Sequence, residues 1–259
     1  MPGQCDNRRS GVAYAACLLA VVALGTGCYE PAIPPRLVPD QSFESAVPVG
    51  QYRIAGWSVQ RRPVLLEVLG QGQDVTLVLA GIHGDEAAGT ALVRHLGDYL
   101  DRHRHLLEGK KVVLLPVANP DGKARRTRQN AHGVDLNRNF PSDNRVASPE
   151  SGRTGLSEPE TMVIYRIIRE YRPDRIVSVH QPLGCVDYDG PAEDMAQRMA
   201  EACGLPLKKL GAKPGSLGSY SSQIRRIPIV TLELLDSDSD LMAEQLWARY
   251  GRALLAAFE

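Results

Sequence analysis

The sequence has no net charge, few cysteines and no internal repeat. Its 259 residues hold 30 Lys and Arg against 30 Asp and Glu, and only five cysteines. A disordered chain would be poorer in apolar residues than the 43% found here, and a collagen-like chain would repeat glycine every third residue. A small disulfide scaffold would be shorter and richer in cysteine. The composition therefore indicates one globular domain with a substantial core.

The absence of net charge also excludes a general polyanion binder, because affinity for nucleic acids depends on a clustered excess of Lys and Arg. We therefore expect no nucleic-acid partner. One basic run, residues 123–128, does contain four Lys and Arg. Such a run is usually a solvated surface, although it could also contact anionic lipid or wall polymer.

The N-terminus has the order of a secretory signal. Arg8 and Arg9 precede an apolar stretch, residues 12–24, which ends in small residues before Cys28. The stretch is short for a membrane span of about 20 residues. Cys28 after these small residues resembles a bacterial lipobox, in which the cysteine is lipidated and becomes the new N-terminus, although Gly25 stands where leucine is usual. A plain secreted protein and an uncleaved membrane anchor are the alternatives.

Three regions follow from this interpretation: a leader at residues 1–27, a tether at 28–45 and an enzyme domain at 46–259. The tether is too rich in proline for a helix or a central strand. Loss of the leader removes one acid and two arginines, which leaves 28 basic and 29 acidic residues. We expect an exported protein of the periplasm or cell envelope, held at the membrane by a lipid on Cys28.

Cys185 and Cys203 are the other cysteines of the exported chain. In an oxidising compartment the two could form a disulfide, but a sequence does not show whether they lie within bridging distance. Two separate, buried thiols are the alternative.

Apolar, β-branched runs alternate with helical patterns in the domain. Strands are predicted at residues 64–69, 75–80, 112–117, 176–179 and 229–234, and helices at 86–100, 161–171, 191–203 and 239–257. Ser157 and Glu160 predict a capping box before the second helix. The alternation predicts a three-layer α/β/α domain with a largely parallel or mixed central sheet. Two polar stretches, residues 121–157 and 213–222, are predicted to be functional loops.

Three residues beyond strand ends are candidate metal ligands. His83 and Glu86 follow the second predicted strand, and His180 follows the fourth. Sites in such sheets gather at the carboxyl ends of strands, and three protein ligands with a fourth position left to water are typical of catalytic zinc. Alone, the His83 and Glu86 spacing also fits a polar loop histidine and an acid at a helix N-terminus. The remaining histidines of the domain are predicted at the surface or the core edge: His95, His103, His105 and His132.

Further candidates are an acid and an Asn-Arg pair. Glu233 lies among apolar residues of the last predicted strand, where an unpaired buried carboxylate is costly, so we expect it to face a cleft or a partner. Beside a metal-bound water it would act as a general base, and a solvated strand edge is the alternative. Asn137 and Arg138 can hold a carboxylate, because guanidinium binds it through two parallel hydrogen bonds.

Taken together and in order, these segments resemble the zinc metallocarboxypeptidase family. The motifs are GIHGDE around His83 and Glu86, NPDG from Asn119, DLNRNFP from Asp135, SEPET from Ser157, SVH ending at His180, and TLEL around Glu233. The resemblance extends from residue 52 to the C-terminus. It implies the fold of that family and one zinc ion bound by His83, Glu86 and His180.

The same resemblance implies the other roles. Glu233 is the general base and then the proton donor to the leaving amine, and Asn137 and Arg138 hold the terminal carboxylate of a peptide substrate. An arginine upstream of DLNRNFP polarises the scissile carbonyl. We assign this role to Arg128, with Arg125 as the alternative because the loop length varies in the family.

Within the family, the sequence is similar to the murein peptide amidases and related γ-D-glutamyl-diaminopimelate peptidases, which release the diamino acid from cell-wall stem peptides. The similarity rests on the compact length, the HGDE motif and residues 180–191 and 214–220. Substrate selection is expected around Leu217, Gly218 and residues 187–190.

Two features depart from the family pattern. Digestive carboxypeptidases have a mobile tyrosine in the loop before the Glu strand, whereas no tyrosine precedes Tyr220 in that stretch here, so no catalytic tyrosine is assigned. Murein peptide amidases are typically cytoplasmic, whereas this chain has an export signal. Ordinary peptides or N-acyl amino acids are the alternative substrates, and a non-catalytic, wall-binding lipoprotein is the alternative function.

Overall fold

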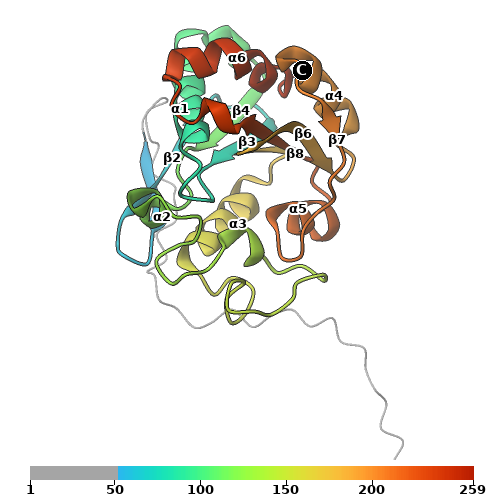
Figure 1. Ribbon diagram of the computed structural model, residues 1–259. Coiled ribbons are helices and arrows are strands. Elements are labelled where there is room, and N and C mark those ends of the chain that lie inside the picture. Colours follow the sequence, from blue (N-terminus) through green and yellow to red (C-terminus); the bar gives the residue numbers. More distant parts are fainter. Residues whose placement is uncertain (1–51) are drawn as a thin grey trace, which may run out of the picture. The chain divides into compact units, whose positions relative to one another are not determined.

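A mixed sheet of eight strands runs through residues 52–259, the part of the chain that the computed structural model describes (Figure 1). The predicted leader, the tether and Cys28 lie outside the described residues. The strands are β1 (Arg53–Trp57), β2 (Pro63–Leu69), β3 (Asp74–Ala80), β4 (Lys110–Leu115), β5 (Arg175–His180), β6 (Leu183–Asp189), β7 (Leu207–Lys208) and β8 (Ile229–Leu235). The α-helices are α1 (Ala87–Arg102), α2 (Pro120–Arg125), α3 (Pro159–Tyr171), α4 (Glu193–Cys203), α5 (Leu217–Ser219) and α6 (Ala243–Ala256). Shorter 3-10 or π turns are formed by Arg104–Leu107, Leu136–Arg138, Tyr220–Ile224 and Asp236–Asp238.

The centre of the sheet is parallel. The strands lie in the order β1-β2-β4-β3-β5-β8-β6-β7, and β4, β3, β5 and β8 all run in the same direction. β2 pairs antiparallel with β4 on one side, and β6 pairs antiparallel with β8 on the other. This confirms the predicted α/β class with a mixed sheet. The arrangement brings the carboxyl ends of β3, β5 and β8 to one edge, where sites in such sheets form.

Two apolar layers cover the opposite faces of the sheet, because side chains alternate along each strand. In β3, Val78 and Ala80 pack in a cluster with α1, α4 and α6, whereas Leu77 and Leu79 pack in a second cluster with α3 and α5. Figure 1 shows α1, α4 and α6 on one side of the sheet and α3 and α5 on the other. All four β3 side chains are fully buried. The fold is therefore held by apolar burial on both faces, worth roughly 25 cal/mol per Å² removed from water.

All five predicted strands are present, as β2, β3, β4, β5 and β8, and the four predicted helices are α1, α3, α4 and α6. Helix α6 begins later than predicted because residues 239–240 form a turn and Met242 is the residue before its first turn, and Asp236–Asp238 forms a 3-10 turn ahead of both. The buried carboxylate of Asp238 in this turn accepts hydrogen bonds from Arg249 and Tyr250 of the helix. The elements β1, β6, β7, α2 and α5 were not predicted.

The predicted capping box at Ser157 and Glu160 is wrong. The first residue before α3 is Glu158, and no side chain caps the helix. Glu160 is fully buried, and its carboxylate instead accepts hydrogen bonds from the Val59 N–H and from Asn130 Nδ2, both at 3.0 Å. Glu160 therefore connects the turn after β1 to the loop that follows α2.

A disulfide between Cys185 and Cys203, which the sequence left open, is not formed, since both are free thiols. Cys185 is buried in β6, whereas Cys203 is the last residue of α4, and its Sγ donates to the carbonyl oxygen of Met199 at 3.2 Å. The alternative of two separate thiols is therefore the one that the structure contains. Among residues 52–259, no helix is long and apolar enough to cross a membrane.

Candidate metal centre and substrate pocket

Two strand ends supply the candidate metal centre. The turn between β3 and α1 contains His83 and Glu86, and β5 ends with His180. In the parallel pairing of β5 with β8, His180 lies opposite Glu233. The side chains that the sequence predicted as ligands and base are therefore brought to the same edge of the sheet by the register of β5 with β8 and by the turn that follows β3.

The three predicted ligands converge on one point. Oε1 of Glu86 lies 2.6 Å from Nδ1 of His83, and Oε2 lies 2.9 Å from Nδ1 of His180. The two Nδ1 atoms are 3.2 Å apart, and one donor atom from each of the three residues lies within 4.8 Å of the others. All three residues are buried. A single positive centre between the rings would satisfy all three donors, and two imidazoles with one carboxylate are ligands that zinc prefers.

The electrostatics of the cluster also favour a cation. Burial alone would lower the pKa of His83, but its contacts with Asp135 and Glu86 outweigh burial and raise the pKa to about 8. Burial would likewise raise the pKa of Glu86, but the neighbouring His180 and His83 lower it to about 2. The carboxylates are thus held ionised, and positive charge is stabilised between them. The donor set and its charge fit a divalent metal ion.

Asp135 is a further candidate residue of the site, and no role was predicted for it from the sequence. Only 1% of it is exposed, and its Oδ1 lies 3.2 Å from Nε2 of His83. Its Oδ2 accepts from Nε of Arg128 at 2.9 Å. A carboxylate on the second nitrogen of a ligand imidazole fixes the orientation of the ring. Its place at the start of the DLNRNFP motif was the only signal in the sequence.

Glu233 is half-buried and lines the same pocket as the three ligands. Burial raises the pKa of its carboxyl group, the charge of Glu86 acts in the same direction, and His180 opposes them. The Leu183 N–H is 3.5 Å from Oε2. A carboxylate with a raised pKa beside a metal centre is suited to accept and return a proton near neutral pH.

The pocket has a volume of about 230 Å³ and contains the predicted cationic residues. Arg128 and Arg138 both line it, together with Asn137, whereas Arg125 is exposed and is not among its lining residues. Nη1 of Arg128 is 3.8 Å from Oε1 of Glu86. Arg128, rather than Arg125, is therefore the arginine that this geometry brings to the metal centre.

The loop that carries Arg138 is packed against residues 213–222. Oδ1 of Asn137 accepts from the Leu217 N–H at 2.8 Å, and the Phe140 N–H donates to the Gly215 carbonyl at 2.9 Å. Gly215 has a φ of +69°, and a Cβ there would lie 2.3 Å from the Arg138 carbonyl oxygen. Only glycine fits this close approach. The two predicted functional loops therefore form one wall of the pocket.

A second close approach positions the His83 turn. A Cβ on Gly84 would lie 2.0 Å from the carbonyl carbon of Gly122 in α2. Asn119 caps α2 by accepting from the Gly122 N–H at 2.8 Å, and its Nδ2 donates to the Ile82 carbonyl at 3.3 Å. The NPDG segment is thus a support for the metal-ligand turn.

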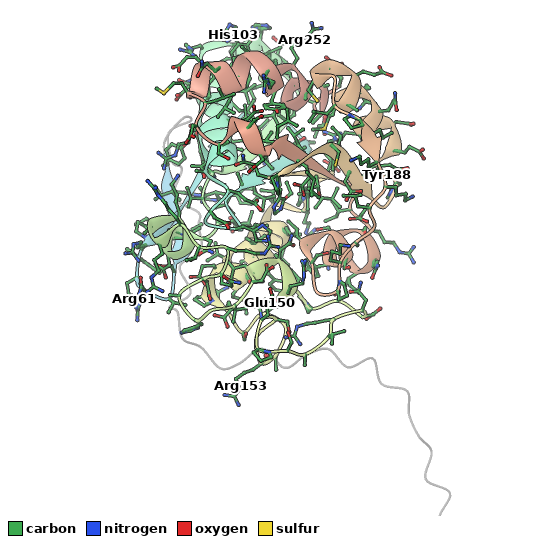
Figure 2. All side chains as sticks on the ribbon, viewed as in Figure 1. Arg61, His103, Glu150, Arg153, Tyr188 and Arg252 are labelled. Carbon is green, nitrogen blue, oxygen red and sulfur yellow. The ribbon has the colours of Figure 1, made fainter. Side chains whose placement is uncertain are left out.

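The other histidines of the described chain lie outside the cluster. His95 stacks on Trp247, His103 stacks on Tyr99, His105 is exposed and Nδ1 of His132 is 2.8 Å from Glu158. Figure 2 shows His103 at the outer edge of the layer formed by α1 and α6. Their predicted places at the surface or core edge agree with these contacts.

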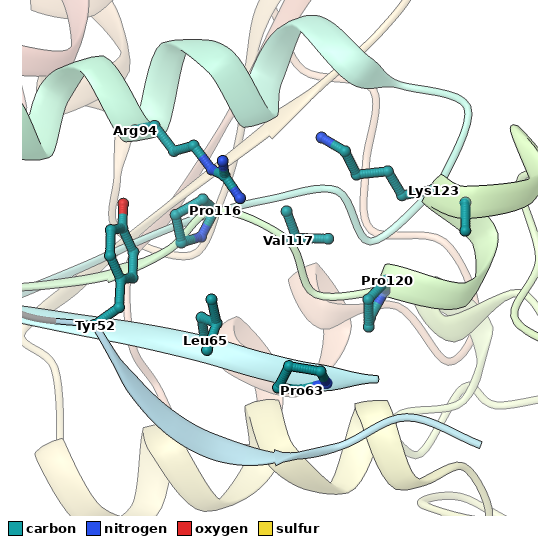
Figure 3. A pocket seen from close by; sticks show the side chains of 9 residues that line it. Tyr52, Pro63, Leu65, Arg94, Pro116, Val117, Pro120 and Lys123 are labelled. Atoms are coloured by element: carbon teal, nitrogen blue, oxygen red, sulfur yellow. The ribbon is translucent and has the colours of Figure 1, made fainter. Parts of the chain in front are cut away.

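A second cavity of about 320 Å³ lies between β2, α1 and α2 (Figure 3). It is lined mainly by apolar residues, with Tyr52, Arg94 and Lys123 among them. None of the predicted ligands, bases or substrate-binding residues contributes to it. This second cavity is therefore separate from the candidate metal centre.

Comparison with known proteins shows the family of the chain. A model of the family described as zinc carboxypeptidase matches residues 49–184, which include His83, Glu86 and His180 but not Glu233. Murein peptide amidase A of Escherichia coli (strain K12) is 35% identical over 191 residues, covering 65% of this chain and 74% of that protein.

Solved structures show the same fold. Murein-tripeptide amidase MpaA from Escherichia coli O157 superposes with a TM-score of 0.64 at 27% identity, covering 83% of this chain and 94% of the other. Bovine thrombin-activatable fibrinolysis inhibitor, in complex with tick carboxypeptidase inhibitor, gives a TM-score of 0.69 at 19% identity, covering 80% and 88%. The latter likeness concerns the fold alone.

The chain thus belongs to the zinc carboxypeptidase family, and it is a zinc-dependent metallopeptidase. Within that family it is similar to the murein peptide amidases.

We expect His180→Ala to bind zinc more than about 100-fold more weakly than the unchanged protein. Loss of a residue that only hydrogen-bonds to a metal ligand typically lowers metal affinity about 10–100-fold, and loss of a ligand itself should cost more. Metal content after desalting, measured by mass spectrometry, checks this. His105→Ala is the matched control, since His105 is exposed and outside the cluster. A full equivalent of zinc in His180→Ala would contradict the ligand assignment.

Proposed function

We propose that this protein is an exported zinc peptidase or amidase that cleaves the amide bond before a carboxylate-bearing C-terminal residue. The observation that carries the proposal is the composition of one pocket. Glu233 and the His83, Glu86 and His180 cluster share it with Arg138 and Asn137. A hydrolytic centre and a carboxylate-binding pair in one cavity suit a substrate cut near its free terminus.

When bound, zinc supplies Lewis acidity, which polarises a carbonyl oxygen and lowers the pKa of a water towards about 7. Glu233 takes the proton from the attacking water on its carboxylate and returns it to the nitrogen of the leaving amine. Its raised pKa supports both steps. Arg128, held by Asp135, steadies the oxygen that becomes negative.

Arg138 and Asn137 hold the terminal carboxylate. The Arg138 side chain donates to the Asn137 carbonyl through Nη1 at 2.6 Å, and Asn137 is itself fixed by the Leu217 N–H. Fixed donors lose less conformational entropy when a substrate binds. This pair therefore orients the substrate so that its last amide faces Glu233.

The substrate that we propose is the γ-D-Glu-diaminopimelate bond of peptidoglycan stem peptides. Support comes from the similarity to murein peptide amidase A and from two carboxylates, Asp187 and Asp189, in the same pocket. Hydrolysis of a panel of muropeptides and protein-like peptides, with and without a chelator and with products identified by mass, tests this directly. If amino acids are released only from ordinary peptides, those peptides rather than wall peptides are the substrates. If zinc binds but no peptide is cleaved, the result favours a non-catalytic binding protein.

We further propose that the chain works in the periplasm or cell envelope, anchored by a lipid on Cys28. The support is the order of charged, apolar and small residues before Cys28. An exported enzyme would meet wall peptides where they are attached.

Glu233→Gln should keep its zinc but lose about 10²- to 10⁴-fold in kcat, the usual contribution of a positioned acid-base group. Glutamine preserves the size of the side chain and removes its capacity to carry a proton. Metal analysis and steady-state kinetics check this, with Glu244→Gln on the exposed face of α6 as the control. Turnover close to that of the control would refute the assignment.

Arg138→Ala should raise KM about 10- to 100-fold for substrates with a free terminal carboxylate, since hydrogen bonds to charged groups are worth about 1.5–3 kcal/mol. Substrates with an amidated terminus should be affected much less. Arg125→Ala is the control because Arg125 is exposed and outside the pocket. An unchanged KM for the free acid would exclude the proposed role.

Cys28→Ser should move the protein from the membrane fraction to the soluble periplasmic fraction when the full chain is expressed in a Gram-negative host. Its N-terminal peptide should be lighter than that of the unchanged protein by the mass of the lipid. Cys17→Ser, inside the predicted leader, is the matched control. Membrane retention of Cys28→Ser with an intact leader would indicate an uncleaved anchor instead.

A further inference from the structure

The substrate pocket has a second charged region, supplied by β6. Along this strand Val186 and Tyr188 point into the apolar core, so Asp187 and Asp189 lie on the opposite face. Both acids line the pocket that contains the metal cluster. Two carboxylates spaced two residues apart on one strand face are neighbours, and like charges of this kind repel each other unless a cation lies between them.

Strand register places the two acids at increasing distance from Glu233. In the antiparallel pairing of β6 with β8, Cys185 lies opposite Glu233, Asp187 opposite Thr231 and Asp189 opposite Ile229. With about 3.3 Å per residue, Asp187 lies about 7 Å and Asp189 about 13 Å along the strand from the level of Glu233. Thr231 and Ile229 also line the pocket. A long side chain that starts beside Glu233 therefore runs towards both acids.

The backbone holds the two carboxylates in place without neutralising them. Oδ1 of Asp187 accepts from the Leu210 N–H at 2.8 Å, and the Asp189 carboxylate accepts from the Ala212 N–H. A Cβ on Gly218 would lie 2.4 Å from Oδ2 of Asp189, so the pocket wall is closed against this acid.

No cation within residues 52–259 forms an ion pair with Asp187 or Asp189. Lys209, whose charge acts on Asp189, lies with Nζ 4.7 Å from the centre of the Tyr188 ring. Burial and the charge of Asp187 raise the pKa of Asp189 to about 6. Asp187 and Asp189 can therefore bind a positively charged group of a ligand.

A cation stands at the rim beside them. Lys213 follows Ala212, the residue that donates to Asp189, and it lines the same pocket. Its carbonyl oxygen accepts from Ser219 Oγ at 2.9 Å and from the Ser216 N–H at 3.0 Å, which fixes its backbone. Within the described chain its exposed side chain makes no ion pair. The part of the pocket away from Glu233 thus presents two carboxylates and one ammonium group to a ligand.

We propose that Asp187 and Asp189 bind an ammonium group at the end of the substrate side chain, and that Lys213 binds a carboxylate on the same carbon atom. The proposal rests on the proposed function, since it assumes that the C-terminal residue enters this pocket. It identifies the substrate class as a C-terminal residue with an amino-acid head group at the far end of its side chain. The side chain of diaminopimelate ends in both an ammonium and a carboxylate group. The side chain of lysine has only the ammonium group, which the two acids would bind, and that of 2-aminopimelate has only the carboxylate group, which Lys213 would bind.

Three tripeptides, L-Ala-γ-D-Glu joined to meso-diaminopimelate, L-lysine or L-2-aminopimelate, separate the two contacts. Steady-state kinetics on the zinc-loaded protein give the ratios of kcat/KM between them. For the unchanged protein the diaminopimelate peptide should be preferred over each of the others by about tenfold or more, as expected for one charged hydrogen bond.

Asp189→Asn should lower the ratio of diaminopimelate to 2-aminopimelate about tenfold or more, because only the former has the distal ammonium group. Lys213→Met should instead lower the ratio of diaminopimelate to lysine. Asp194→Asn, on the exposed face of α4, should change neither ratio. An equal loss on all three peptides in Asp189→Asn, or no preference in the unchanged protein, would overturn the proposal. If Asp189→Asn does not fold, the exposed Lys213→Met still tests it.

Binding of free meso-diaminopimelate to zinc-loaded Glu233→Gln, followed by calorimetry, separates this inference from the proposed function. Binding that weakens about tenfold on adding Asp189→Asn supports the subsite even if no tripeptide is cleaved, which would refute only the proposed reaction. Cleavage with ratios insensitive to Asp189 and Lys213 would refute only the subsite.

Discussion

The parallel pairing of β3, β5 and β8 is the constraint on which the site depends. It is maintained by side chains such as Leu77, Val78 and Val177, which are fully buried between the helical layers. Because the strands run in one direction, the residues just beyond their carboxyl ends must meet. The register that sets His180 opposite Glu233 is therefore a consequence of core packing, and a slip of one strand by one residue would turn its side chain to the other face.

Residues outside the candidate metal cluster hold its ligands in position. Asp135 contacts both His83 and Arg128, so one buried carboxylate couples a candidate metal ligand to the arginine proposed to act on the substrate. Asn119 and Gly84 hold the turn of His83 against α2. These supports come from three separate loops, which explains why polar stretches without regular periodicity surround the site.

The sequence alone was sufficient for the elements whose patterning comes from the core. β2, β3, β4, β5 and β8 are runs of apolar residues, and all were predicted to within two residues. β6 was missed because Asp187 and Asp189 interrupt its apolar pattern, and they do so because that face lines a pocket. The predicted capping box failed for a tertiary reason, since the Val59 N–H and Asn130 take the carboxylate of Glu160.

The candidate site, like the fold, could be predicted from the sequence only in part. His83, Glu86, His180 and Glu233 were recognisable because metal-ligand types and a lone acid follow or end apolar strands. The choice of Arg128 over Arg125 could not be made from the sequence, because it depends on the path of a loop, and a disulfide between Cys185 and Cys203 could not be excluded without their positions.

The contact between Gly215 and the Arg138 carbonyl has a further consequence. The pocket wall formed by residues 213–222 is joined to the loop of Arg138 through main-chain atoms, whereas the candidate metal ligands belong to the turn after β3 and the end of β5. The exposed side chain of Lys213 can therefore be exchanged while the backbone of this wall remains docked, which leaves the hydrolytic machinery intact. The architecture separates the evolution of selectivity from that of reactivity, and it marks this segment as the place to redesign the enzyme for a different terminal residue.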